Sequence, residues 1–227
     1  MMRRALLAAI GFSALSATAA LAADMPPSRY MPPPRAPAYV PFFMWTGFYV
    51  GINAGYGFGT SNWTDTAGVT TGDFNVSGGA VGGTLGYNMQ FGSAILGIET
   101  DLDWASIKGS TAVNCGTTCD TELQWLGTTR ARLGYALDRF LPYITGGAAY
   151  GSIKASLSGI GSTTATKVGW TAGGGLEYAF LNNWTVKAEY LYVDLGTVAC
   201  DAICTGGIPA DVSFHSHLVR GGINFKF

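Results

Sequence analysis

The amino-acid sequence predicts an all-β protein, an eight-stranded antiparallel transmembrane up-and-down β-barrel. Three observations lead to this prediction. Apolar residues alternate with small or polar residues in eight segments, which is the period of a β-strand. Only 12% of the 227 residues are charged and 33 are Gly, a composition unlike that of a soluble α/β enzyme. The alternating segments also carry more large apolar side chains than the interior of a small closed barrel can hold.

The eight segments follow one another through the carboxy-terminal four-fifths of the chain. In the first, Phe48, Val50 and Ile52 alternate with Tyr49 and Gly51. The connections after the second, fourth and sixth segments are short, and the others run to about ten residues or more. Long connections outside and short ones inside are typical of outer-membrane barrels, which predicts that both termini are periplasmic. The predicted strands lie near residues 45–58, 76–87, 94–105, 122–135, 142–152, 167–179, 184–194 and 212–227.

The choice of the inward face decides the class of barrel. The apolar faces carry more than the roughly dozen side chains that pack in layers inside an eight-stranded barrel, so they are predicted to face lipid. On the fourth strand this outward set includes Leu123, Trp125, Leu133 and Tyr135. The opposite faces are rich in Gly, a poor choice for a strand in water. Small residues and charges are therefore expected to fill a narrow lumen.

Charged residues within the strands fall mostly on the inward register. A run of acids such as that on the third strand could serve a metal or catalytic site, but bases lie on neighbouring strands. Because buried charge is costly unless it is paired, the sequence predicts a lumen ion-pair network and no catalytic residue, metal or cofactor. Lys226 is grouped with these residues, which gives five acids and five bases. The other predicted members are Glu99, Asp101, Asp103, Arg130, Arg132, Glu177, Lys187, Glu189 and Arg220.

The first 44 residues have two different compositions. Arg3 and Arg4 precede an apolar run and an A-x-A site, which predicts a secretory signal peptide over residues 1–22. Residues 23–44 contain seven of the nine prolines and are expected to form an extended periplasmic leader. The barrel is assigned to residues 45–227.

Four cysteines and two histidines are candidate site residues. The cysteines form two C-x-x-x-C pairs in an exported chain, which favours local loop disulfides over a metal site of four thiolates. His215 and His217 lie two residues apart on the lipid-facing register of the last strand, at the outer rim. They could bind a metal, but two ligands without a third make a weak site. The cysteines are Cys115, Cys119, Cys200 and Cys204.

Several segments resemble a known family. WTGFYVGINAGYGFG, RARLGYALDRFLPYITGGAAYG and HLVRGGINFKF are similar to the small outer-membrane barrels of alphaproteobacteria, the outer-membrane immunogenic or porin-like surface antigens. The resemblance implies an OmpA-like barrel in the outer membrane of a Gram-negative cell, surrounded by lipid and lipopolysaccharide. It also implies that Phe225 and Phe227 form a signal for the barrel-assembly machinery. Roles in envelope integrity, surface antigenicity and sometimes haem binding follow from the same resemblance.

The sequence therefore predicts a structural surface barrel, with a narrow solute channel or surface ligand binding as alternatives. An enzyme is not expected, because no nucleophile and histidine fall together on the inward register. Nucleic acid is not expected as a partner, since the formal net charge is −1 and no basic patch is present. No domain is expected after the barrel, so any peptidoglycan contact would depend on the Pro-rich leader.

Overall fold

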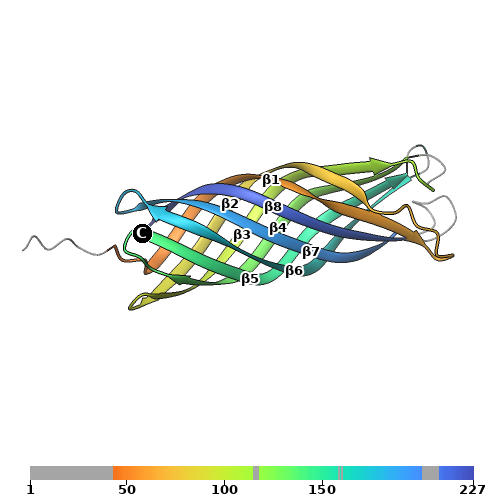
Figure 1. Cartoon of the computed structure of the whole chain (residues 1–227). Coiled ribbons are helices and arrows are strands. Elements are labelled where there is room, and N and C mark those ends of the chain that lie inside the picture. Colours follow the sequence, from red (N-terminus) through yellow and green to blue (C-terminus); the bar gives the residue numbers. More distant parts are fainter. Residues whose placement is uncertain (1–42, 115–117, 158, 160, 201–209) are drawn as a thin grey trace, which may run out of the picture. The chain divides into compact units, whose positions relative to one another are not determined.

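The protein is a closed antiparallel barrel of eight strands, as predicted (Figure 1). The computed structural model describes residues 43–114, 118–157, 159, 161–200 and 210–227. Each strand pairs with the next, and β8 pairs with β1 to close the barrel. The described residues contain no helix long and apolar enough to cross a membrane. The strands are β1 (Gly47–Asp65), β2 (Phe74–Phe91), β3 (Ala94–Thr111), β4 (Cys119–Tyr135), β5 (Phe140–Leu157), β6 (Gly161–Ala179), β7 (Trp184–Cys200) and β8 (Ala210–Lys226).

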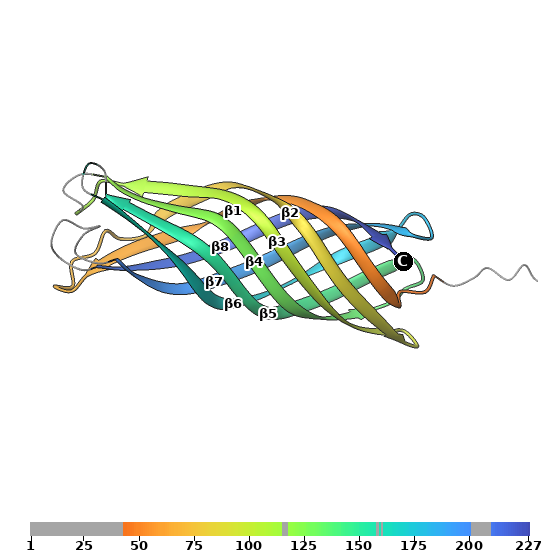
Figure 2. The same ribbon diagram turned by 180° about the vertical axis from the view of Figure 1, so that it is seen from behind.

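The two ends of the barrel differ. The short β2–β3, β4–β5 and β6–β7 connections lie at the same end as the carboxy terminus, and the β1–β2 connection lies at the opposite end (Figures 1 and 2). Towards that opposite end the strands are longer than predicted. Only residues 158–160 separate β5 from β6, whereas the sequence pattern predicts a connection over residues 153–166. The Ser- and Thr-rich stretches on both sides pair with each other up to Leu157 and Gly161, so they extend the sheet.

Aromatic side chains on the outer wall form two rings. On β1, Phe48 and Phe58 lie ten residues apart, and on β7 Trp184 and Tyr192 lie eight apart. At about 3.3 Å per residue and a tilt near 40°, these separations correspond to roughly 20–25 Å, the height of the apolar band of an outer-membrane barrel. We call them the lower girdle (Phe48, Tyr87, Tyr135, Phe140, Tyr178, Trp184, Phe225) and the upper girdle (Phe58, Trp104, Trp125, Tyr150, Trp170, Tyr192, His217).

Between the girdles the outer wall is apolar and the lumen is polar. Ile52, Leu102 and Ile144 are 70%, 61% and 63% exposed on the outer wall. The inward side chains at the same height include nine buried charged residues. This polarity suits a barrel whose wall lies in lipid, because only the lumen can satisfy charged groups there.

Above the upper girdle the polarity is reversed. Each strand continues for about seven residues beyond this ring, for example from Phe58 to Asp65 on β1. The inward side chains of this upper part form a buried apolar cluster, whereas its outer wall carries polar residues such as Asn62, Lys108 and Glu122. A barrel section with an apolar interior and a polar wall is suited to water. The cluster includes Trp63, Val76, Ile107, Leu123, Leu126, Ile153, Leu191, Val193, Leu195, Val212, Phe214 and Leu218.

The predicted lipid-facing position of Leu123 is wrong. It was expected on the lipid-facing side with Trp125, but its side chain is fully buried in the upper apolar cluster. Relative to β5, a β-bulge between Leu123 and Trp125 inserts one residue into β4. Since side chains alternate with a period of two, one extra residue moves every side chain beyond it to the opposite face. Leu133 and Tyr135, on the other side of the bulge, face outward as predicted.

The lower mouth of the barrel is occupied by the residues that precede β1. Trp45 is 1% exposed, and its indole Nε1 donates a hydrogen bond to the carbonyl oxygen of Asp138 at 2.9 Å. Its backbone nitrogen donates to Gln90 Oε1 at 2.8 Å. Trp45 and Phe43 pack edge to face, with ring centroids 4.7 Å apart, and join Ile95 and Leu141 in a second apolar cluster. Apolar side chains therefore fill the lumen on both sides of its charged centre.

Candidate functional site

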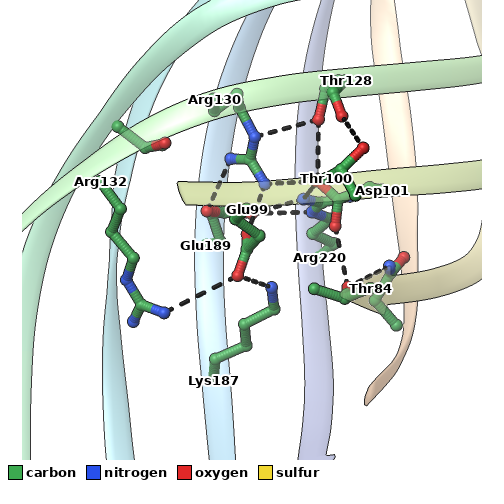
Figure 3. A network of polar contacts seen from close by, with 12 residues as sticks. Thr84, Glu99, Thr100, Asp101, Thr128, Arg130, Arg132, Lys187, Glu189 and Arg220 are labelled. Carbon is green, nitrogen blue, oxygen red and sulfur yellow. Dashed lines mark hydrogen bonds and ion pairs between the residues drawn. The ribbon is translucent and has the colours of Figure 1, made fainter. Parts of the chain in front are cut away.

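The nine charged residues predicted to line the lumen lie together in its centre, between the two apolar clusters. Figure 3 shows the part of this network around Arg130, Glu99 and Asp101. Alternation on β3 places Glu99, Asp101 and Asp103 on the inward face, and β4 contributes Arg130 and Arg132 in the same way. The remaining members come from β6, β7 and β8 across the barrel, namely Glu177, Lys187, Glu189 and Arg220. The network therefore joins five of the eight strands.

Arg130 is the centre of the network. Its guanidinium contacts Glu99 at 2.6 Å, Asp101 at 2.5 Å and Glu189 at 2.8 Å. Its Nε also donates to the hydroxyl of Thr128. The side chains of Arg130 and its three acidic partners are at most 1% exposed. Charge-assisted hydrogen bonds with this geometry offset the desolvation of the buried charges.

Arg220 duplicates part of this arrangement from β8. Its guanidinium contacts Asp101 at 2.8 Å, Glu189 at 2.8 Å and Asp103 at 2.9 Å. Asp101 and Glu189 are thus shared between Arg130 and Arg220. Because each shared carboxylate has two cationic partners, removal of one arginine leaves the other in contact.

Arg132 and Lys187 form the part of the network nearest the lower mouth. Arg132 is hydrogen-bonded to Glu177 and lies 3.6 Å above the ring centroid of Tyr143. Lys187 contacts Glu99 at 3.0 Å. Among the described residues, Arg132 is the one cation within ion-pair distance of Glu177. This pair consequently lacks the duplication found around Arg130.

Neutral polar residues complete the network. They are not among the members that the sequence predicts, which are all charged. The Tyr49 hydroxyl donates to Glu99 at 2.8 Å, and the Tyr143 hydroxyl donates to Glu189 at 3.1 Å. Thr84 and Thr128 each donate to Asp101 at 2.8 Å. These residues follow the same alternation as the charged ones, so the sequence pattern could have predicted that they face inward. It could not have predicted their hydrogen-bond partners, because the partners lie on other strands.

Two glycines of β2 make room for the buried side chains. A Cβ at Gly82 would collide with the carboxylate of Asp103, and one at Gly86 would collide with the ring of Tyr49. The inward glycines thus allow large polar side chains to lie across the neighbouring strand.

Lys226 does not belong to the network, although the sequence analysis grouped it there. Its ammonium group is hydrogen-bonded to the carbonyl oxygen of Met44 and lies 5.1 Å from the ring centroid of Phe43 at the lower mouth. The position near the end of β8 takes it past the charged centre. The network therefore contains five acids and four bases rather than equal numbers.

The arrangement is chemically one of mutual neutralisation. All five carboxylates of the network accept hydrogen bonds from arginine or lysine. Within the described residues, no group of three or more His, Cys, Asp or Glu is placed to hold a metal ion. His215 and His217 face outward, away from the lumen carboxylates. Neither of these two histidines is therefore placed to activate a nucleophile among the described residues of the lumen.

Cys119 and the aromatic residues of the predicted assembly signal lie at opposite ends of the barrel. Cys119 begins β4, is 3% exposed and is disulfide-bonded. Cys115 and Cys204 fall outside the described residues, so the two local pairings remain predictions. Phe225 packs against Trp184, with ring centroids 5.1 Å apart, and Phe227 is 70% exposed at the lower end.

Comparison with known proteins decides the family. The family model for the outer membrane protein beta-barrel domain matches residues 5–225. The chain belongs to this family. It is 40% identical over 246 residues to the 31 kDa outer-membrane immunogenic protein of Brucella melitensis, and the match covers all of both chains. It is 32% identical over 189 residues to the 22 kDa outer membrane protein of Rhizobium leguminosarum, covering 81% of this chain and 78% of that one.

Solved structures are also similar to this chain. Neisserial surface protein A matches 80% of this chain and 98% of its own, with 17% identity and a TM-score of 0.46. The membership of the family, together with the closed barrel and its two girdles, places this member of the family in the outer membrane of a Gram-negative bacterium. The outer wall of the barrel is surrounded by the lipid and lipopolysaccharide of that membrane.

Proposed function

We propose that the protein is a structural barrel that contributes to envelope integrity and carries its connecting loops above the membrane as a surface antigen. The observation that supports this proposal is the reversal of polarity at the upper girdle. Seven residues beyond that ring correspond to roughly 18 Å along the barrel axis, at 3.3 Å per residue and a tilt near 40°. A section of this height with its own apolar core is a rigid support for the loops.

The orientation proposed for the barrel places the short connections and both termini in the periplasm. Short periplasmic turns and longer extracellular loops are the rule in this class of barrel. The upper section, with its polar wall, then stands outside the cell. The relatives in Brucella are named for their immunogenicity, which agrees with exposure of this section.

A structural role is favoured over the channel alternative by the filling of the lumen. A conducting pore needs a continuous polar path, but here the charged centre lies between two layers of buried apolar side chains. The central charges are also paired across the barrel, so Arg130 and Arg220 bridge β3 and β7.

Single-channel recording tests the choice between barrel and channel. The mature protein, refolded in detergent and inserted into a planar lipid bilayer, should give no stable conductance steps. A porin inserted under the same conditions serves as the positive control. Reproducible steps from the unmodified protein would show that the lumen conducts and would overturn the structural assignment.

A further inference from the structure

A cluster of aromatic and histidine side chains stands out on the upper girdle. His217 of β8 stacks on Phe58 of β1, with ring centroids 5.5 Å apart and an interplanar angle of 21°. On its other side lies Tyr190 of β7, whose hydroxyl is 2.6 Å from His217 Nδ1. Tyr192 also contacts the imidazole, with centroids 5.3 Å apart. The imidazole is therefore fixed in position by three aromatic neighbours.

A second histidine continues the cluster away from the membrane centre. His215 lies two residues further along β8, with Nδ1 3.5 Å from the carboxylate of Asp194 and 3.4 Å from the hydroxyl of Tyr192. Its side chain is 42% exposed. Polar groups thus follow the aromatic ring upward, at the height where lipid headgroups begin.

Directly below this cluster the outer wall is hollowed. A groove of about 700 Å³ extends over β7, β8, β1 and β2 to Trp104 of β3, with small residues Ala54 and Gly221 among its lining. Ile52, Val186, Ile223 and Trp104 also line it. Gly221 is four residues from His217 and Phe225 is four residues further, so the groove lies between the two girdles. Its surroundings are hydrocarbon, and its occupant must be an apolar chain.

We propose that β1, β7 and β8 form a binding site for a phosphorylated glycolipid of the outer leaflet. One acyl chain lies in the groove, and a phosphate lies against His217 at the upper girdle. With Nδ1 accepting the hydroxyl proton of Tyr190, the proton of the imidazole is on Nε2, which donates to a phosphate oxygen. His215 and Asp194 then flank the sugar headgroup with one donor and one acceptor.

A phosphorylated glycolipid fits this surface better than a second copy of the chain. The groove is apolar, but the cluster above it ends in two imidazoles and the carboxylate of Asp194, whose remaining hydrogen-bonding atoms need polar partners. A lipid supplies both halves in one molecule. The assignment to the outer leaflet rests on the proposed orientation, in which the upper girdle faces outward.

Native mass spectrometry of the full-length mature protein, refolded in detergent, tests the site with hexa-acylated lipid A as the probe. The Gly221→Leu variant fills the groove. An added Cβ at Gly221 meets only the Lys187 carbonyl oxygen at 3.7 Å, so the backbone tolerates it. Gly146→Leu is the matched control on the opposite wall, where a Cβ meets only the Thr171 carbonyl oxygen at 3.6 Å.

The unmodified protein and Gly146→Leu should retain one lipid A molecule, and Gly221→Leu should lose it. His217→Ala should weaken retention about tenfold, in line with the loss of one charge-assisted hydrogen bond. The effect of His217→Ala should vanish with dephosphorylated lipid A, and inorganic phosphate alone should not be retained.

Equal loss in Gly146→Leu and Gly221→Leu would overturn the site, as would phosphatidylglycerol bound as tightly as lipid A. A dimer that dissociates on Gly221→Leu would assign the groove to a second copy instead. The assay is carried out in detergent and does not measure conductance. Its failure would therefore leave the structural assignment of the barrel standing, and conductance steps would leave the lipid site standing.

Discussion

Removing single arginines from the lumen network should reveal which ion pairs are duplicated. Arg130 contacts three buried carboxylates, but each has a second cation: Lys187 for Glu99, and Arg220 for Asp101 and Glu189. Breaking a buried pair costs about 3–5 kcal/mol when a charge is left uncompensated. We expect Arg130→Ala to lower the free energy of unfolding by about 3 kcal/mol, the lower end of that range.

Arg132→Ala should be at least as destabilising, although Arg132 makes fewer ion pairs. Its loss leaves Glu177 buried with hydrogen bonds from Thr185 and Asn224 but without a cation among the described residues. We expect a loss of about 5 kcal/mol. The double variant Arg132→Ala/Glu177→Ala should be more stable than Arg132→Ala alone, because the orphaned charge is removed as well.

Urea unfolding of the refolded barrel in lipid vesicles, followed by tryptophan fluorescence, measures these differences. Lys108→Ala is the control, since Lys108 pairs with Glu122 on the exposed outer wall at 2.9 Å and should contribute about 0–1 kcal/mol. If Arg132→Ala is no worse than Lys108→Ala, or if the double variant equals the sum of its single variants, the lumen charges do not interact as described.

Three further predictions concern topology, assembly and the bulge. An epitope tag inserted at Gly161 should react with antibody on intact cells, whereas one at Asn182 should react only after the outer membrane is opened. The reverse result would show that the barrel has the opposite orientation in the membrane. Deleting Phe227 should sharply lower insertion in cells but leave refolding in detergent nearly unchanged, and normal insertion would remove its role as an assembly signal. Leu123→Asp should destabilise the refolded barrel by several kcal/mol through an unpaired buried charge, and Leu133→Asp, at the outer wall, should instead impair membrane insertion; similar behaviour of the two variants would contradict the assigned faces.

The sequence by itself determined the fold class and the faces of most strands. A period of two is a local property, so Glu99, Asp101 and Asp103 could be placed inside and Phe48 and Ile52 outside from their spacing alone. The ring of lower aromatics at Phe225 followed from the same register. The number of apolar side chains and the alternation of short and long connections indicated an outer-membrane barrel, and the family resemblance pointed to the same membrane.

Tertiary structure alone decided the partners and the exceptions. Which base meets which acid depends on the register and curvature of the closed sheet, and this brings Arg220 to Asp103 across 117 positions of sequence. The bulge beside Leu123 changes the face of that residue without any Gly or Pro to mark it. The reversal of polarity above the upper girdle was hidden for a related reason. A strand alternates in the same way in lipid and in water, and only the height of each residue in the finished barrel tells which face must be apolar.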